Sequence, residues 1–153
     1  MNTETRNISV NIRPAVIADL QKIIDLDAEV TGLEKKDYWE DRFDRFTERD
    51  GRHLIVAESA TPSDFLGFIV GEVRAWEFGS RPCGWIFAIG VDPEQRVQGI
   101  GEQLYNAMCE AFKADGASAV RTMIGREDQL NMSFFRAQGM MGGPFIELEK
   151  PLD

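Results

Sequence analysis

The chain has 153 residues, 43% of them hydrophobic, and a formal net charge of -9, values typical of one globular domain with a single core and unfavourable for non-specific binding to nucleic acid. An acidic surface of this kind favours basic partners such as amines. No apolar run approaches the roughly 20 residues that span a bilayer, and the polar start lacks the apolar segment of a signal peptide, so we expect a cytoplasmic protein that does not enter a membrane.

The first half of the chain predicts two amphipathic helices among three strands. Alternating apolar and polar residues predict a first strand that ends at Pro14. Apolar residues at helical spacing predict a helix that opens at Ala18 and is ended by Gly32. Gly67 and Gly71 interrupt a long apolar run and mark a β-bulge or the close approach of another backbone. The predicted strands are 8–14, 53–58 and 65–78, the last two antiparallel, and the second predicted helix is 38–46.

The second half centres on a continuous apolar run, residues 85–91, which predicts a strand covered on both faces. Pro93 follows it, and a proline cannot continue a central strand. Apolar residues then recur at helical spacing over residues 100–112, and a strand at 118–124 implies a crossover that makes the two strands parallel. A helix over 129–138 and a last strand over 145–149 complete the prediction. The fold class is α/β, or α+β in detail: one domain over residues 1–153, with a mixed sheet of six or seven strands and about four helices on both faces.

The turn between the central strand and its helix predicts an anion site. The first amides of a helix have no partner, and the helix dipole places about half a positive charge there. Gly99 and Gly101 allow a bulky phosphate to approach the backbone, and Arg96 adds a cation. A Walker loop is excluded because Glu102 follows where lysine is required, and a dinucleotide fingerprint is disfavoured because Leu104 stands where a small residue is required.

The remaining pattern, Arg-x-x-Gly-x-Gly after a strand ending in Val-x-Pro, resembles the acetyl-CoA motif of the GNAT superfamily of N-acetyltransferases. The strand predicted at 118–124 and the segment 134–140, FFRAQGM, are similar to the elements that follow this motif in the family. The resemblance covers about half of the chain. It implies the GNAT fold and acetyl-CoA as the co-substrate.

By this resemblance, main-chain groups of Ile89 and Val91 pair with the pantetheine amides like an added strand, and amides from Val97 to Glu102 hold the pyrophosphate. The amide near Ile89 would also polarise the thioester carbonyl, which gives Ile89 a catalytic role. The residues implied in coenzyme binding are Ile89, Gly90, Val91, Arg96, Val97, Gln98, Gly99, Ile100, Gly101, Glu102, Asn131 and Phe135.

The proton transfers are assigned from departures from the family pattern. Histone acetyltransferases of the superfamily place a glutamate about where Trp85 falls here, so Glu72 or Glu77 on the preceding strand is the candidate base, directly or through water. Many members carry a tyrosine where Phe135 stands. Other candidate proton donors are therefore needed, and they are Tyr38, Ser133 and Cys83. The family's helix-start asparagine falls at Asp128, with Asn131 close enough to replace it, and Glu29, Glu34, Asp37 and Tyr38 are expected near the incoming amine.

Two functions are compatible with these residues. The first is an N-acetyltransferase that moves the acetyl group of acetyl-CoA to a primary amine, either a protein N-terminus or lysine or a small-molecule amine, by direct attack in a ternary complex. The alternative is a non-catalytic acyl-CoA-binding or regulatory module of the same fold, suggested by Phe135 and Trp85. One histidine and two separated cysteines offer no metal site, and we expect reduced thiols, a structural role for His53, and a monomer or homodimer.

Overall fold

The computed structural model describes residues 9–46, 49–60 and 64–153, and the side chains of residues 96–98 lie outside that description. The chain divides into two compact units, Met1–Met123 and Ile124–Asp153. A single domain over the whole chain stays a prediction.

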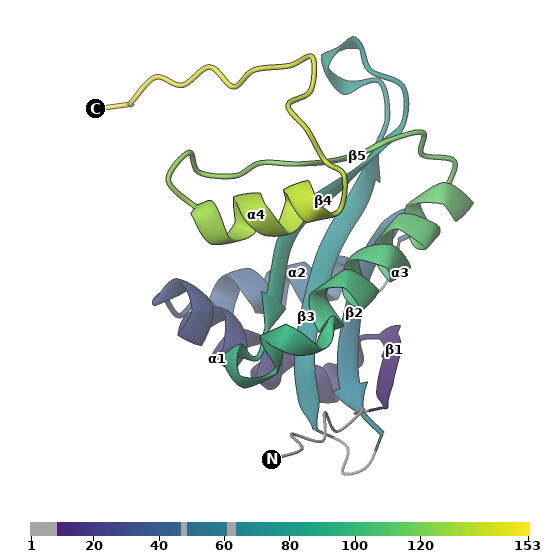
Figure 1. Ribbon diagram of the computed structural model, residues 1–153. Coiled ribbons are helices and arrows are strands. Elements are labelled where there is room, and N and C mark those ends of the chain that lie inside the picture. The colour runs from purple at the N-terminus through teal and green to yellow at the C-terminus, as the bar shows by residue number, and fades with distance from the viewer. Residues whose placement is uncertain (1–8, 47–48, 61–63) are drawn as a thin grey trace, which may run out of the picture. The chain divides into compact units, whose positions relative to one another are not determined.

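The first unit is built around a mixed sheet of five strands in the order β1-β2-β3-β4-β5 (Figure 1). Neighbours from β1 to β4 are antiparallel, and β5 runs parallel to β4. The predicted antiparallel pair and the predicted parallel pair are thus both confirmed. The strands are β1 Val10–Pro14, β2 Arg52–Ser59, β3 Phe65–Arg74, β4 Cys83–Val91 and β5 Val120–Thr122.

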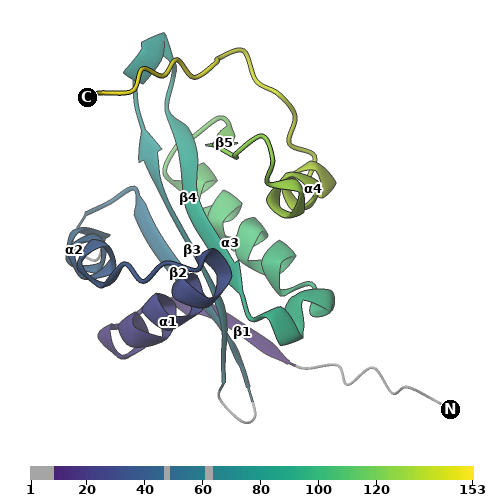
Figure 2. The same ribbon diagram turned by 90° about the vertical axis from the view of Figure 1, so that its left-hand side faces the viewer.

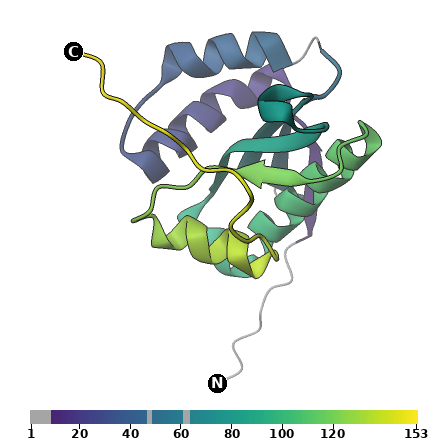
Figure 3. The same cartoon turned by 90° about the horizontal axis from the view of Figure 1, so that it is seen from above.

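Helices cover both faces of this sheet. Helix α1, Leu20–Thr31, and helix α2, Lys36–Phe46, lie on one face, and helix α3, Ile100–Ala114, lies on the other (Figures 2 and 3). Three short 3-10 turns connect the elements: η1 Ile17–Asp19, η2 Glu77–Gly79 and η3 Pro93–Gln98. The second unit contains helix α4, Gln129–Ala137, followed by an extended segment.

Successive side chains of each strand point to opposite faces of the sheet, so the sheet has a core on each face. On the side of α1 and α2, Val56 and Phe68 pack with Ile23 and Trp39, all at most 1% exposed. On the side of α3, glycines allow the helix to lie close to the strands. A β-carbon at Gly84 would stand 2.0 Å from Cδ2 of Phe112.

Two further glycines confirm the predicted close approaches on β3. A β-carbon at Gly67 would lie 2.6 Å from the carbonyl oxygen of Gly90, and one at Gly71 would lie 2.5 Å from that of Trp85. Because both obstacles are backbone atoms of the neighbouring strand, they cannot move aside as a flexible side chain would.

The predicted count of six or seven strands is wrong, because the described part of the chain forms five, and two predicted strand ends are wrong as well. No strand forms over 145–149; Ile146 and Leu148 are 87% and 89% exposed, and an alternating pattern becomes a strand only where an edge pairs with it. Strand β3 ends at Arg74 instead of residue 78. The reason is that Trp76, just before η2, and Phe78, within it, adopt positive φ angles. Strand β5 covers three residues rather than seven. Residue 8, the predicted start of the first strand, lies outside the described residues.

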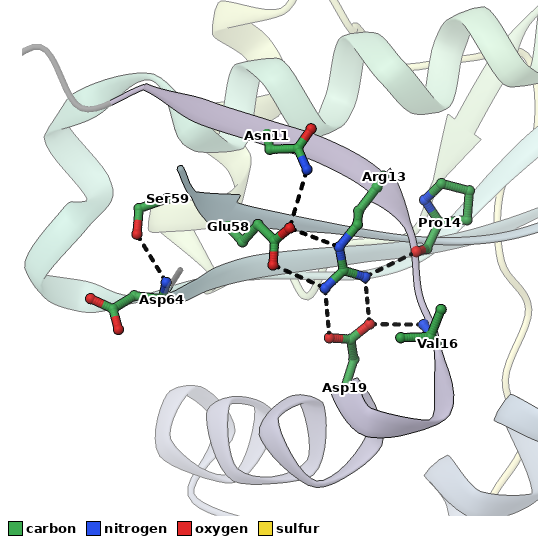
Figure 4. A network of polar contacts seen from close by, with 8 residues as sticks. All are labelled: Asn11, Arg13, Pro14, Val16, Asp19, Glu58, Ser59 and Asp64. Carbon is green, nitrogen blue, oxygen red and sulfur yellow. Dashed lines mark hydrogen bonds and ion pairs between the residues drawn. The ribbon is translucent and has the colours of Figure 1, made fainter. Parts of the chain in front are cut away.

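A partly buried ion-pair network fixes β1 to its neighbours (Figure 4). The Arg13 guanidinium on β1 donates to both carboxylate oxygens of Asp19, at 2.7 and 3.0 Å, and to both of Glu58 on β2, each at 3.0 Å. Asp19 also accepts from the Val16 amide at 2.8 Å, and its side chain is 3% exposed. The network therefore joins β1, β2 and the start of α1.

Candidate functional site

Strand β4 carries a β-bulge at its centre. In the pairing with β3, Val70 lies opposite Ala88 and Gly71 lies opposite Ile86, so Phe87 is an extra residue without a partner. The side chains of Phe87 and Ala88 both pack toward the core under α1 and α2. Two successive side chains on one face are what an inserted residue produces.

The bulge changes which main-chain groups of β4 point toward β5. Before it, the Gly84 amide donates to the carbonyl of Ala119 at 2.9 Å, and the Ile86 carbonyl accepts from the Thr122 hydroxyl at 2.9 Å. The even-numbered residues therefore face β5 in this part of the strand, and the ladder with β5 ends at Ile86.

After the bulge, the odd-numbered residues take over that side. The Asp92 amide donates to the Leu66 carbonyl of β3 at 2.8 Å. Groups of an antiparallel strand alternate between its two neighbours, so the amides and carbonyls of Ile89 and Val91 point away from β3. No strand in the described part of the chain pairs with β4 there. The result is an unpaired strand edge with polar main-chain groups at a spacing of two residues.

This edge leads directly into the turn before α3. The Asp92 carboxylate accepts from the Glu94 amide at 3.0 Å and caps η3. Gly99 then adopts a φ angle of 72°, and a β-carbon there would meet nothing within 4 Å. The Gln103 amide bonds to the Gly99 carbonyl at 3.1 Å, which begins the helix.

The first turn of α3 contains Ile100, Gly101 and Glu102. Ile100 is fully buried and anchors the turn, whereas Gly99 and Glu102 are exposed. First-turn amides have no carbonyl one turn earlier in their helix, and the dipole of a 15-residue helix adds positive potential. The predicted residues 96–98 lie in η3, and the predicted cation of Arg96 falls outside the described side chains.

On the opposite face, the junction of α1 and α2 is built on a buried carboxylate. Asp27 is 5% exposed and accepts from Trp39 Nε1 at 2.9 Å and from Lys35 Nζ at 3.0 Å. Next to Trp39, Tyr38 is 39% exposed and its ring meets the Trp39 ring edge-on, with centroids 5.2 Å apart. The acidic residues expected near the amine, Glu29, Glu34 and Asp37, are all exposed.

The predicted base Glu72 is engaged by two arginines. Its carboxylate accepts from Arg52 Nε at 3.0 Å and from Arg74 Nε at 3.1 Å. On β4, Trp85 lies directly opposite. Arg74 also approaches Glu77 at 3.6 Å. The predicted carboxylates are thus brought together, and the structure adds two cations beside them.

Arg42 is a residue that the sequence analysis did not single out. Its guanidinium carbon lies over three aromatic rings: Tyr38 at 4.8 Å, Phe87 at 4.9 Å and Phe46 at 5.2 Å. The spacing of 38, 42 and 46 along one helix predicts a shared face. That the bulge residue Phe87 completes the set could not be predicted from the sequence.

In the second unit, α4 begins at a side-chain cap. The Asp128 carboxylate accepts from the Asn131 amide at 3.1 Å and from Asn131 Nδ2 at 2.7 Å. Phe135 is 4% exposed and meets Phe134 edge-on at 5.1 Å. Asn131 is therefore bound by the residue that aligns with the family's asparagine, and Phe135 is buried.

The remaining candidate groups have local partners. The Cys83 thiol donates to the Arg81 carbonyl at 3.1 Å, and burial raises the pKa of the Cys109 thiol. His53 Nε2 lies 2.5 Å from the Asp115 carboxylate, consistent with a structural role. Within residues 9–46, 49–60 and 64–153, no three His, Cys, Asp or Glu side chains form a metal cluster. Over the same ranges, none of the helices combines the length and the apolar character that a membrane crossing requires.

Comparison with known proteins gives matches at the level of family and fold. Residues 19–140 match the sequence model of the acetyltransferase (GNAT) family. Mycothiol acetyltransferase of Kocuria rhizophila is 27% identical over 86 residues, which are 56% of this chain and 28% of that protein. The chain therefore spans under a third of the length of this curated relative.

Two solved structures illustrate the shared fold. The aminoglycoside N-acetyltransferase AAC(6')-Iy in complex with CoA superposes with a TM-score of 0.83 at 17% identity, covering 96% of this chain and 97% of the other. Glucosamine-6-phosphate N-acetyltransferase from Arabidopsis thaliana gives a TM-score of 0.73 at 21% identity, covering 95% and 99%. At such identities the likeness concerns the fold alone.

Proposed function

The chain belongs to the acetyltransferase (GNAT) family, and from this premise we propose that it transfers the acetyl group of acetyl-CoA to a primary amine by direct attack in a ternary complex. The observation that carries the proposal is the unpaired edge of β4 at Ile89 and Val91, which continues into the first turn of α3. The amides and carbonyls of the β4 edge and the amides of the first turn of α3 thus follow one another along the chain.

The two parts of acetyl-CoA match these two groups of main-chain atoms, in the order in which they follow one another. Its pantetheine arm carries two amides that can pair with an exposed strand edge as an added strand does. Its diphosphate requires donors and positive potential, which the turn from Val97 to Glu102 supplies through main-chain amides. Gly90 lies between these two residues and leaves room for the ring of Phe68, since a β-carbon there would lie 2.6 Å from Cε1 of Phe68. A protein with the same fold was solved in complex with CoA, which supports CoA as the kind of ligand.

The transfer itself needs a polarised carbonyl and a neutral amine. The Ile89 amide polarises the thioester carbonyl, the amine nitrogen attacks its carbon, a C–N bond forms and the C–S bond breaks. An alkylammonium group has a pKa near 10.4, so a proton must be removed at neutral pH. We assign this step to Glu72 through a water, because each of its oxygens accepts from one arginine and keeps a lone pair.

The departing thiolate needs a proton that Phe135 cannot supply. We assign this proton to the Tyr38 hydroxyl, on the face of the sheet toward which the bulge turns Phe87. Replacing Glu72 by Gln should flatten the rise of kcat with pH, whereas Tyr38→Phe should lower kcat without changing the affinity for acetyl-CoA. An unchanged pH profile, or an unchanged kcat, removes the corresponding assignment.

The coenzyme site has a matched test at the two ends of α3. Gly99 and Gly116 both have positive φ angles, 72° and 88°, and a β-carbon at either position meets nothing within 4 Å. Asparagine tolerates this conformation, so Gly99→Asn and Gly116→Asn should cost similar folding stability. Only Gly99→Asn should weaken acetyl-CoA binding in calorimetry, by at least about tenfold as expected for a blocked anion site. Equal affinity of both variants would refute the site.

The acceptor is defined here only as an amine. The names of the matched proteins include aminoglycoside and glucosamine-6-phosphate acetyltransferases, which supports a small amine, and protein N-termini and lysines remain within the proposal. A panel of amines and peptides with acetyl-CoA, followed by free-thiol release and mass spectrometry, identifies the product. Tight CoA binding without acetylation of any amine would instead favour a non-catalytic acyl-CoA-binding module.

A further inference from the structure

Arg42 is a cation without a carboxylate partner among the described residues. It is half-buried on α2, and its guanidinium makes no ion pair or hydrogen bond with any residue that the structure describes. None of its nitrogens is fully buried. By contrast, Arg45 on the same helix pairs with Asp41, and Arg52 pairs with Glu72. A partly desolvated guanidinium with five unused donors is well suited to receive an anion.

The three rings around Arg42 hold it in place for such a role. Guanidinium groups stack on aromatic faces, which supports the charge and restricts the side chain while leaving the in-plane N–H groups available. The rings come from two different elements, with Tyr38 and Phe46 on α2 and Phe87 on β4. The position of Arg42 is therefore fixed by tertiary packing as well as by its own helix.

The surrounding charge is positive although the protein is acidic. Arg74 also lies over the ring of Phe87, at 5.1 Å, and Arg52 lies over the ring of Phe46, at 5.6 Å. These two arginines share Glu72, and Arg74 also approaches Glu77. Among the described side chains that these contacts connect, three guanidinium groups thus stand against two carboxylates, in a chain with a net charge of -9. A local surplus of this sign attracts anions and repels cations.

The cluster adjoins the proposed reaction centre. Phe87, which Arg42 and Arg74 both contact, is the bulge residue two positions before Ile89. We infer that the acceptor amine carries an anionic group, a carboxylate or a phosphate, and that Arg42 binds this group while the amine faces the thioester. This inference rests on the proposed function. A planar guanidinium takes either anion with two parallel hydrogen bonds. Polycationic acceptors such as aminoglycosides are disfavoured by the same charge.

Calorimetry on the protein saturated with CoA measures acceptor binding without turnover. Two matched pairs differ in one anionic group: glucosamine 6-phosphate against glucosamine, and L-serine against L-serinamide. We expect the anionic member of at least one pair to bind at least about tenfold more tightly, as for charged hydrogen bonds of a bidentate pair. Which pair shows the preference distinguishes a phosphate from a carboxylate.

Three variants assign the preference to a residue. Arg42→Gln should abolish the preference, and Arg42→Lys should keep only part of it because an ammonium lacks the planar fork. Arg45→Gln, which removes an exposed and paired arginine from the same helix, should leave it unchanged. Equal binding or no binding of both members in both pairs overturns the inference, as does an equal loss with Arg45→Gln. Loss of CoA binding itself, measured first, would overturn the proposed function instead.

Discussion

Replacing Asp19 by Asn tests whether the network around Arg13 anchors β1. Burial of this carboxyl raises its pKa, but the hydrogen bond from Arg13, the Val16 amide and the charge of Arg13 together outweigh burial, so the pKa of Asp19 lies below its usual value. The carboxylate is therefore more stable in the folded chain than in the unfolded one. Its contribution to stability is complete above the unfolded pKa, near 3.9, and disappears as the pH falls through the folded pKa.

The expected size follows from the contacts. Hydrogen bonds to a charged group contribute about 1.5–3 kcal/mol each, and Asp19 accepts three. Asparagine keeps one accepting oxygen, and Glu58 still neutralises Arg13. We therefore expect Asp19→Asn to lower the free energy of unfolding by about 2–3 kcal/mol at pH 7. The difference should shrink below pH 4, where the carboxyl of the unfolded wild-type chain becomes protonated, and should vanish once the folded carboxyl is protonated as well.

Urea unfolding followed by circular dichroism at pH 7, 5 and 3 measures this difference. Asp25→Asn is the control, because Asp25 is exposed on α1 and bonds only to Gln21 among the described residues; its effect should stay within about 0.5 kcal/mol. A loss below about 1 kcal/mol at pH 7, or one of the same size at pH 3, would show that the charge of Asp19 does not stabilise the fold.

Two further predictions concern buried positions around α3 and β4. Gly84→Ala should destabilise the protein by about 1–3 kcal/mol, because the added carbon would overlap the ring of Phe112, which is 2% exposed. Gly142→Ala is the control, because its added carbon meets nothing within 4 Å, and equal melting temperatures of the two variants would contradict the packing. Burial raises the pKa of Cys109, and Cys83 is 3% exposed. A thiol reagent at pH 8 should therefore label the native protein much more slowly than the urea-unfolded protein. Rapid labelling of one thiol per chain without urea would refute this.

The elements near the centre of the chain could be predicted because their signals are local. An apolar run, a proline, a glycine turn and a helical period follow one another between Trp85 and Phe112, and each specifies backbone conformation by itself. The segment 145–149 has a strand pattern that is just as regular, yet it forms no strand. A pattern states what a segment would bury if it were paired, whereas pairing depends on an edge elsewhere in the fold.

The candidate site divides in the same way. Gly99 could be located because its positive φ angle restricts the residue type. The bulge at Phe87 could not, since one inserted residue leaves no mark in composition, and without it Ile89 and Val91 would point toward β3. Arg42 stands at a regular helical spacing, but whether a carboxylate pairs with it is decided by the folded chain, and none does among the residues that the structure describes.

This division bears on how the two halves of the proposed reaction are encoded. A coenzyme site made of main-chain groups requires only a particular backbone conformation. Many sequences can adopt that conformation, so the site can be predicted from the family resemblance. An acceptor held by side chains depends on a few individual residues such as Arg42. In this chain those residues surround the ring of Phe87, whose outward neighbours on β4 are the groups proposed to hold the thioester. The inserted residue would thus set both the edge that binds acetyl-CoA and the aromatic surface that positions the cation for the amine, which couples the two substrates through one feature of the strand.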